Sequence, residues 1–382
     1  MSHLELKAVL DDLRRTAALE FSAARSAPPS IYHHPDLLSL EADKIFKQEW
    51  ICVGRTQEIP NFGDYLTYEI IDQPIFVIRQ KDESIAAFAN VCAHRCAKLL
   101  AGKGCSTRIS CPYHSWTYAL DGQLIGAPYM DQTPGFDKAN YRLASVRSEI
   151  WEGFIYVTLN DELSPVAERL KGLHEIVGQF RMADYEPVFE GDEIWNTNWK
   201  CLIENFMDAM HIHRVHKDSF AKDGVGEDLT TCFEGDSYFT WHQIDASSNS
   251  SRGFAHESNT WLSEEFRSRI LLLGLFPSHT IQLQPDMLWY LSLMPVGMSQ
   301  VRIRWRVSIP GEILDNLPDR EKHIADVKEL LTQVNSEDRP VVEGLFQATA
   351  STLAKAGPMS HLERNVYEFD RYVARKLIEE EQ

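Results

Sequence analysis

Two short segments of the chain carry paired cysteine and histidine residues. Cys92 and His94 form a C-x-H pair, and Cys111 and His114 form a C-x-x-H pair sixteen residues later. Two thiolates suit one iron of a [2Fe–2S] cluster and two imidazoles suit the other, an arrangement whose reduction potential lies well above that of an all-cysteine cluster. A structural zinc site is the alternative, but zinc fingers usually pair cysteine with cysteine and histidine with histidine.

The residues around these segments sharpen the interpretation. Asparagine and valine precede the first pair at 90–91, and the segments SWTY at 115–118 and DG at 121–122 follow the second. In spacing and flanks the region resembles the Rieske domain of the Rieske non-heme iron oxygenases, a large family of ring hydroxylases and N-demethylases. The resemblance implies a Rieske cluster held by Cys92, His94, Cys111 and His114.

Length and composition limit the class of protein. A chain of 382 residues predicts about two domains. The formal net charge of −18 argues against nucleic acid or an anionic membrane surface as a partner. No apolar run approaches the length of a membrane span, and the first residues lack the apolar region of a signal peptide. The seven cysteines are an odd number and show no spacing typical of a disulfide framework, which predicts a cytoplasmic protein.

The pattern of elements changes along the chain. Helical patterns at 4–21 and 36–50 precede short strands with turn residues from 51 to about 160. Beyond these strands, the sequence predicts a helix at 200–217, strands within 280–308, a helix at 319–355 interrupted near 335–340, and an amphipathic helix at 361–378. We therefore expect an α+β protein, with a small antiparallel β domain at 47–160 that holds the cluster. The larger domain at 161–382 is expected to be of the helix-grip type, an antiparallel sheet with flanking helices, with residues 1–46 packed on it.

A second chemical group lies in the helix predicted at 200–217. His211, His213 and His216 fall within six residues, close to Asp208 and Glu204. A non-heme Fe(II) site needs two histidines and one carboxylate, with other positions open for O2 and substrate. Helix geometry leaves the pair open: His213 and His216 share a face, whereas His211 and His216 lie about 140° apart and converge only if the helix distorts.

The family resemblance selects among these residues. Its pattern, Asp/Glu-x2-His-x4-His preceded by Asn, implies Asp208, His211 and His216 with Asn205 ahead of them, and leaves His213 as a spare. The carboxylate candidates farther along the chain are Asp286, Glu337, Asp338 and Glu343. The family's ligand position corresponds to Asp338, with Glu337 as its nearest rival.

The resemblance also implies particular roles and partners. Asp208 would hydrogen-bond His211 and reach the cluster histidine His114 of a neighbouring chain in a head-to-tail homotrimer; a β subunit is left open. Cys96 and Ser115 stand where the family usually has glycine. The chain lacks a GxGxxG nucleotide fingerprint, so we expect a separate flavin reductase, with or without a ferredoxin, to supply electrons.

The implied activity is that of a terminal oxygenase that hydroxylates or dihydroxylates a small, aromatic substrate. Aspartate at position 208 favours this reading, because carnitine-type relatives tend to carry glutamate there. The alternatives are N-demethylation or C–N cleavage of a quaternary ammonium compound, and, more remotely, an electron carrier without catalysis. Seven apolar side chains are candidates for the pocket wall, namely Phe206, Met207, Met210, Phe233, Trp241, Leu283 and Trp289.

Overall fold

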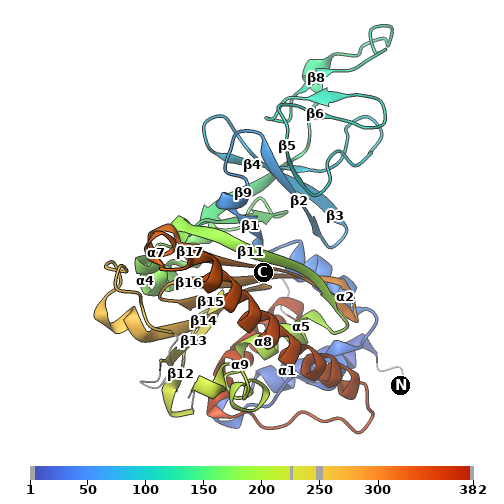
Figure 1. Ribbon diagram of the computed structural model, residues 1–382. Coiled ribbons are helices and arrows are strands. Elements are labelled where there is room, and N and C mark those ends of the chain that lie inside the picture. The colour runs from blue at the N-terminus through green and yellow to red at the C-terminus, as the bar shows by residue number, and fades with distance from the viewer. Residues whose placement is uncertain (1–4, 224–226, 247–252, 379–382) are drawn as a thin grey trace. The chain divides into compact units, whose positions relative to one another are not determined.

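The computed structural model describes residues 5–223, 227–246 and 253–378 (Figure 1). The chain divides into two compact units. Residues 46–168 form the smaller one, called the cluster unit here because it contains both cysteine–histidine pairs. Residues 1–45 and 169–382 form the larger unit. No helix in the described part of the chain is long and apolar enough to cross a membrane.

The cluster unit is built from antiparallel strands. Its main sheet has the strand order β1-β10-β9-β4-β3-β2-β5, and a three-stranded sheet has the order β6-β7-β8. The bounds are β1 Ile51–Arg55, β2 Asp64–Ile70, β3 Gln73–Arg79, β4 Ile85–Ala89, β5 Lys103–Cys105, β6 Ile109–Ser110, β7 Thr117–Tyr118, β8 Leu124–Gly126, β9 Ser145–Trp151 and β10 Phe154–Thr158. One core joins both sheets: Phe76 of β3 and Phe88 of β4 are buried together with Cys92, Cys111 and Tyr118. The loops that carry the cysteines are therefore anchored in the core.

The larger unit is a seven-stranded antiparallel sheet with helices against it, in the strand order β11-β17-β16-β15-β14-β13-β12. The strands are β11 Tyr185–Trp195, β12 Thr230–Phe233, β13 Phe239–Asp245, β14 Arg269–Leu275, β15 His279–Gln284, β16 Met287–Gly297 and β17 Gln300–Pro310. The helices of the chain are α1 Leu6–Ala17, α2 Leu37–Glu41, α3 Val166–Arg169, α4 Lys171–Val177, α5 Trp199–Met207, α6 Ile212–Val215, α7 Gly311–Asn316, α8 Arg320–Thr349 and α9 Arg364–Ile378. Helix α5 packs on β14 and β16, and α9 packs on β12 and β13 (Figure 1). The predicted α+β class is confirmed.

Two predicted helices differ from the observed ones. The helix expected at 200–217 is two helices, α5 and α6, because Asp208 leaves the helical region with φ −77° and ψ 112°. The helix expected to break near 335–340 is instead continuous as α8, although Pro340 removes one backbone donor. A buried stripe at i+3 and i+4 spacing runs along α8 and stabilises the helix through the proline, formed by Leu331, Val334, Asp338, Val342 and Phe346.

A buried polar cluster surrounds the start of α5. The Asn198 side chain caps the helix by accepting from the Lys200 amide at 3.1 Å. The Lys200 ammonium, only 1% exposed, pairs with the equally buried Glu41 carboxylate, which also accepts from the Trp199 indole at 2.7 Å. One turn along, the Tyr32 hydroxyl lies 2.9 and 2.8 Å from the two carboxylate oxygens of Glu204.

The Glu204 carboxyl should make stability depend on pH. Burial raises the pKa of Glu204 to about 7, although Tyr32 and Lys200 oppose the shift. The folded state then holds a proton that the unfolded state releases, so this contribution is present at low pH and is lost as pH rises through 7. The free energy of unfolding of the wild type should fall between pH 5 and pH 8. In Glu204→Gln this fall should be smaller by about 2 kcal/mol, as measured by urea titration at each pH. A variant that keeps the wild-type pH dependence contradicts this assignment.

Candidate metal centres

The two cysteine–histidine loops have the same backbone hydrogen-bond pattern. The Cys92 amide donates to the Ala97 carbonyl at 2.9 Å, and the Cys111 amide donates to the Trp116 carbonyl at 2.8 Å. Both cysteines are buried, at 1% and 3% exposure, whereas His94 and His114 are only partly buried. The two imidazole rings lie 4.8 Å apart, centre to centre, and His94 stacks on Trp116.

This arrangement fits the expected cluster. Two thiols lie in the core and two imidazoles lie toward the surface. The two thiols can bind one iron and the two imidazoles the other, as in a Rieske cluster. The Nδ1 atom of His94 is buried and has no hydrogen-bond partner among the described residues, so this nitrogen is free to bind iron. The structure thus brings together the four predicted residues, Cys92, His94, Cys111 and His114.

The two departures from the family's glycines occupy equivalent positions in the loops. Cys96 has φ 53° and Ser115 has φ 56°, the left-handed region that glycine adopts without a steric penalty. The Cys96 amide donates to the Cys92 carbonyl and the Ser115 amide to the Cys111 carbonyl, each at 3.0 Å. Cysteine and serine therefore retain the turn at a cost of about 1–2 kcal/mol per position.

Tyr118 is a residue whose role the sequence did not reveal. Its hydroxyl lies 3.2 Å from the Cys92 sulfur and accepts from the Ala93 amide at 3.0 Å. A hydrogen bond to a ligating sulfur stabilises the more negative, reduced cluster. We therefore expect Tyr118→Phe to lower the reduction potential by on the order of 50 mV, the equivalent of one ordinary hydrogen bond of about 1 kcal/mol. Protein-film voltammetry measures the shift, and an unchanged potential contradicts the assignment.

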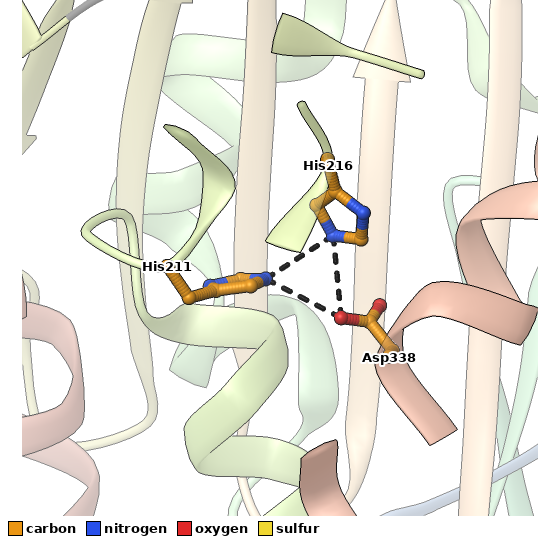
Figure 2. Close-up of side chains that lie close together, drawn as sticks. All are labelled: His211, His216 and Asp338. Carbon is orange, nitrogen blue, oxygen red and sulfur yellow. Dashed lines mark hydrogen bonds and ion pairs between the residues drawn. The ribbon is translucent and has the colours of Figure 1, made fainter. Parts of the chain in front are cut away.

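In the larger unit, His211, His216 and Asp338 converge on one point, as Figure 2 shows. The Nε2 atoms of the two histidines lie 3.3 Å apart. The Asp338 Oδ1 atom lies 3.5 Å from Nε2 of His211 and 3.2 Å from Nε2 of His216. This oxygen is buried and accepts no hydrogen bond from the described residues.

The size of this triangle suits a metal ion. Three atoms at these separations could each bind one metal ion at about 2.1 Å, a usual length for bonds to imidazole nitrogen and carboxylate oxygen. Two imidazoles and one carboxylate on one side are the donor set of non-heme Fe(II) oxygenases. The electrostatics also favour a cation: burial alone would lower the pKa of His211, but the adjacent Asp338 and Asp208 carboxylates raise it to about 10.

The break between α5 and α6 makes this convergence possible. On a regular helix His211 and His216 would point about 140° apart. Because Asp208 is extended, His211 lies between the two helices at the position just before α6, while His216 follows the end of α6. The His211 Nδ1 atom contacts the backbone carbonyl of Asp208 at 2.6 Å, closer than the Asp208 carboxylate at 3.6 Å.

A continuous helix over 200–217 would place Asp208 one turn behind His211, and the observed break excludes that placement. The same helix break that brings the histidines together turns Asp208 out of the helix, so its carbonyl rather than its carboxylate orients the imidazole. The Asp208 carboxylate instead accepts from the Met210 amide at 2.7 Å and remains partly exposed. Its other oxygen, Oδ2, lies 3.6 Å from Nδ1 of His211.

Glu337, the rival third ligand in the sequence, contacts the opposite nitrogen of His216. Its carboxylate lies 2.9 Å from Nδ1 of His216. It also accepts hydrogen bonds from the Ser219 hydroxyl and from the side-chain amide of Gln333. A carboxylate on the far nitrogen fixes the ring and makes the other nitrogen a stronger ligand. Neighbouring acids on one helix thus have different tasks, because successive side chains point about 100° apart.

The remaining candidates have other partners. Asp286 accepts from the Asn259 side chain at 2.7 Å, and Glu343 accepts from the Asn196 amide and the Arg339 side chain. The Nε2 atom of His213 is buried without a partner in the described part of the chain, and this histidine is not part of the triangle.

A largely apolar cavity adjoins the three converging residues. Asn205 lines it, as do Phe206 and Trp289 from the predicted pocket wall. The other five candidates do not line it: Met210 is exposed, Phe233 and Trp241 stack on each other at 4.0 Å, and Met207 and Leu283 are buried in the core. The walls are completed by Ile212, Phe220, Ile244, Ile270, Leu272, Gln282 and Val334.

Comparison with known families and proteins agrees with this geometry. Residues 49–141 match the model of the Rieske [2Fe-2S] domain, and residues 175–379, more than half of the chain, match the catalytic domain of the ring hydroxylating alpha subunit. The matches imply a [2Fe–2S] cluster and a mononuclear iron, the two groups that the residues fit.

Several curated proteins are similar to part of the chain. The glycine betaine monooxygenase oxygenase subunit of Chromohalobacter salexigens is 35% identical, over 54% of this chain and 50% of that protein. The carnitine monooxygenase oxygenase subunit of Acinetobacter baumannii is 33% identical, over 50% of this chain and 52% of its own length. The chain thus spans about half the length of the curated relatives it matches.

Solved structures share the fold over nearly the whole chain. A quaternary ammonium Rieske monooxygenase, described with carnitine oxidation and inter-subunit electron transfer, has a TM-score of 0.81 at 24% identity, over 96% of this chain and 98% of that one. Naphthalene 1,2-dioxygenase from Rhodococcus sp. has a TM-score of 0.79 at 18% identity, over 99% of each chain. With a Rieske domain followed by the matching catalytic domain, this chain belongs to the family of ring-hydroxylating alpha subunits.

Proposed function

We propose that this chain is the terminal oxygenase of a multicomponent Rieske oxygenase, acting on a small organic substrate with O2. The observation that carries the proposal is the triangle of His211, His216 and Asp338 beside a largely apolar cavity. Three ligands on one side of an ion leave its other positions open toward that cavity. A purely electron-carrying protein has no use for such a site.

The roles of individual residues follow from their contacts. Cys92, His94, Cys111 and His114 would hold the cluster, and His211, His216 and Asp338 the single iron. When bound, these groups supply electron transfer and O2 activation. The Asp208 carbonyl and the Glu337 carboxylate orient the two iron-binding imidazoles. The apolar walls exclude water from the reacting substrate, and Asn205 places an amide at the cavity.

The electron supply requires partners. We infer a separate flavin reductase, with or without a ferredoxin, because the sequence carries no dinucleotide fingerprint. We also propose a head-to-tail homotrimer, in which the cluster of one chain serves the iron of the next. A head-to-tail interface closes into a ring through two different, complementary patches. Sedimentation velocity tests this assembly, and a monomer that turns over contradicts it.

Two substrate classes remain to be separated. The aromatic and aliphatic cavity supports hydroxylation of a ring compound. The names of the curated relatives support oxidation of a quaternary ammonium compound. The experiment is O2 uptake and product mass with a surrogate reductase, over a panel of aromatic compounds and N-methyl betaines. Iron analysis is its companion, since the oxygenase requires three iron atoms per chain and an electron carrier only two.

Asp208 is proposed to connect the iron site to the cluster. Because the His211 ring is held by the Asp208 carbonyl, Asp208→Asn should keep the fold, the cluster and most of the iron. Without the carboxylate between two imidazoles, we expect turnover to fall at least tenfold. Stopped-flow mixing of reduced protein with O2 and substrate should show slow cluster reoxidation. The exposed Asp218, paired with Lys217, provides the control Asp218→Asn, and normal reoxidation in Asp208→Asn contradicts the proposed route.

A further inference from the structure

A glutamine in the cavity wall has no hydrogen-bond partner among the described residues. Gln282 of β15 lines the cavity and is only 4% exposed. Its carboxamide makes no hydrogen bond to any residue in 5–223, 227–246 or 253–378. The carboxamide therefore faces the space of the cavity, where a ligand or a bound water can satisfy it.

Trp289 lies directly beside this amide. Gln282 and Trp289 are opposite each other in the antiparallel pair of β15 and β16, so their side chains project from the same face of the sheet. Both line the cavity, and the Trp289 indole nitrogen is buried without a described partner. The indole stands 6.2 Å from the Phe206 ring, centre to centre. A flat ligand can therefore contact aromatic walls while its polar edge meets Gln282.

The charge of the cavity limits what can bind. Among its described lining residues, the ionisable side chains are His211, His216 and Asp338, which face one another. Beyond these three residues, the described walls supply no acid for a substrate ammonium and no base for a substrate carboxylate. Moving a charged group from water into such a place is unfavourable unless it is paired, whereas a neutral polar group needs only a hydrogen bond.

We propose that Gln282 selects an uncharged, flat substrate with one hydrogen-bonding group, and disfavours the charged betaines of the curated relatives. This inference rests on the proposed oxygenase function and specifies its substrate class. The amide oxygen accepts from a substrate N–H or O–H, and the amide nitrogen donates to a substrate oxygen. The ligand thereby satisfies the amide that the protein alone leaves unsatisfied.

The test compares two ligands of equal shape on the iron-loaded protein. Indole offers one N–H and indene offers none, so calorimetric titration without O2 isolates the contribution of the hydrogen bond. We expect indole to bind about tenfold more tightly than indene, and Gln282→Leu to abolish this preference. Glycine betaine and benzoate should bind at least tenfold more weakly than indole. Absence of indole binding, or tighter binding of glycine betaine, overturns the proposal.

A matched control exists on the same strand. Gln284 lies two residues along β15, projects from the same face as Gln282 and does not line the cavity. Gln284→Leu should therefore keep the preference for indole. Should Gln282→Leu fail to fold, Gln282→Met preserves the length of the side chain, and the wild-type ligand ranking alone is still decisive. A Gln282 variant that retains the indole preference overturns the proposal.

Different results would refute the proposed substrate class and the proposed oxygenase function. Oxidation of glycine betaine, with O2 uptake and a demethylated product, would support the oxygenase and refute the selectivity of Gln282. Tight, Gln282-dependent binding of indole to a protein that never consumes O2 with a surrogate reductase would support the selectivity and refute the oxygenase.

Discussion

Asp338→Ala is expected to remove the mononuclear iron and reduce turnover at least a hundredfold, while the cluster and its visible absorption stay. The Oδ1 atom of Asp338 lies 3.5 and 3.2 Å from the two histidine nitrogens and is buried without another partner. Alanine leaves two imidazoles, which hold a divalent ion much less tightly than two imidazoles and a carboxylate. Iron analysis should fall from three atoms per chain to two.

Two other acids on the same helix provide controls for this prediction. Asp326 is exposed and pairs with Lys322, so Asp326→Ala should leave iron content and turnover unchanged. Glu337→Gln weakens the orientation of His216, and should lower iron affinity by about 10- to 100-fold without abolishing it. If Asp338→Ala keeps three irons and full activity, the carboxylate ligand must be another residue, with Glu337 as the first to examine.

Lys200→Met is expected to destabilise the larger unit by about 3–5 kcal/mol at pH 8. The Lys200 ammonium and the Glu41 carboxylate are each only 1% exposed and pair with each other. Methionine fills much of the same volume but leaves the carboxylate buried without a counter-charge, with the Trp199 indole as its hydrogen-bond donor. For a unit of this size, the melting temperature should fall by on the order of 10 °C.

The state of Glu41 provides the control for this second prediction. In Lys200→Met, an unpaired buried carboxylate relieves its cost by taking up a proton, so the destabilisation should shrink at pH 5. Combining Lys200→Met with Glu41→Gln should restore much of the stability, because no buried charge remains. Differential scanning calorimetry of the single and double variants measures both effects. An equal loss at both pH values would assign the effect to packing rather than charge.

The sequence determined the chemistry of both candidate sites. The spacing of Cys92 with His94 and of Cys111 with His114 is specific, because a few ligands close together in the chain form most of a cluster site. The α+β class was also predicted, since hydrophobic patterns and turn residues are local signals. His211, His216 and Asp338 followed only from a family resemblance, because regular helix geometry left the histidine pair open.

Only the tertiary structure decided how those residues are arranged. The break at Asp208 brings His211 and His216 together, and the buried stripe on α8 carries the helix through Pro340. Glu337 and Tyr118 gain their positions from contacts between segments far apart in the chain. No local pattern encodes such contacts.

The pairing of Gln282 with Trp289 has the same origin. Both residues sit in largely apolar strands; the sequence suggested Trp289 as a candidate for the pocket wall but offered no reason to single out Gln282. The register between β15 and β16 places them side by side in the wall of the cavity. Residue types and short spacings therefore determined which metals this protein can bind. Strand register, helix ends and burial decided what surrounds those metals, because these depend on the packing of the whole unit.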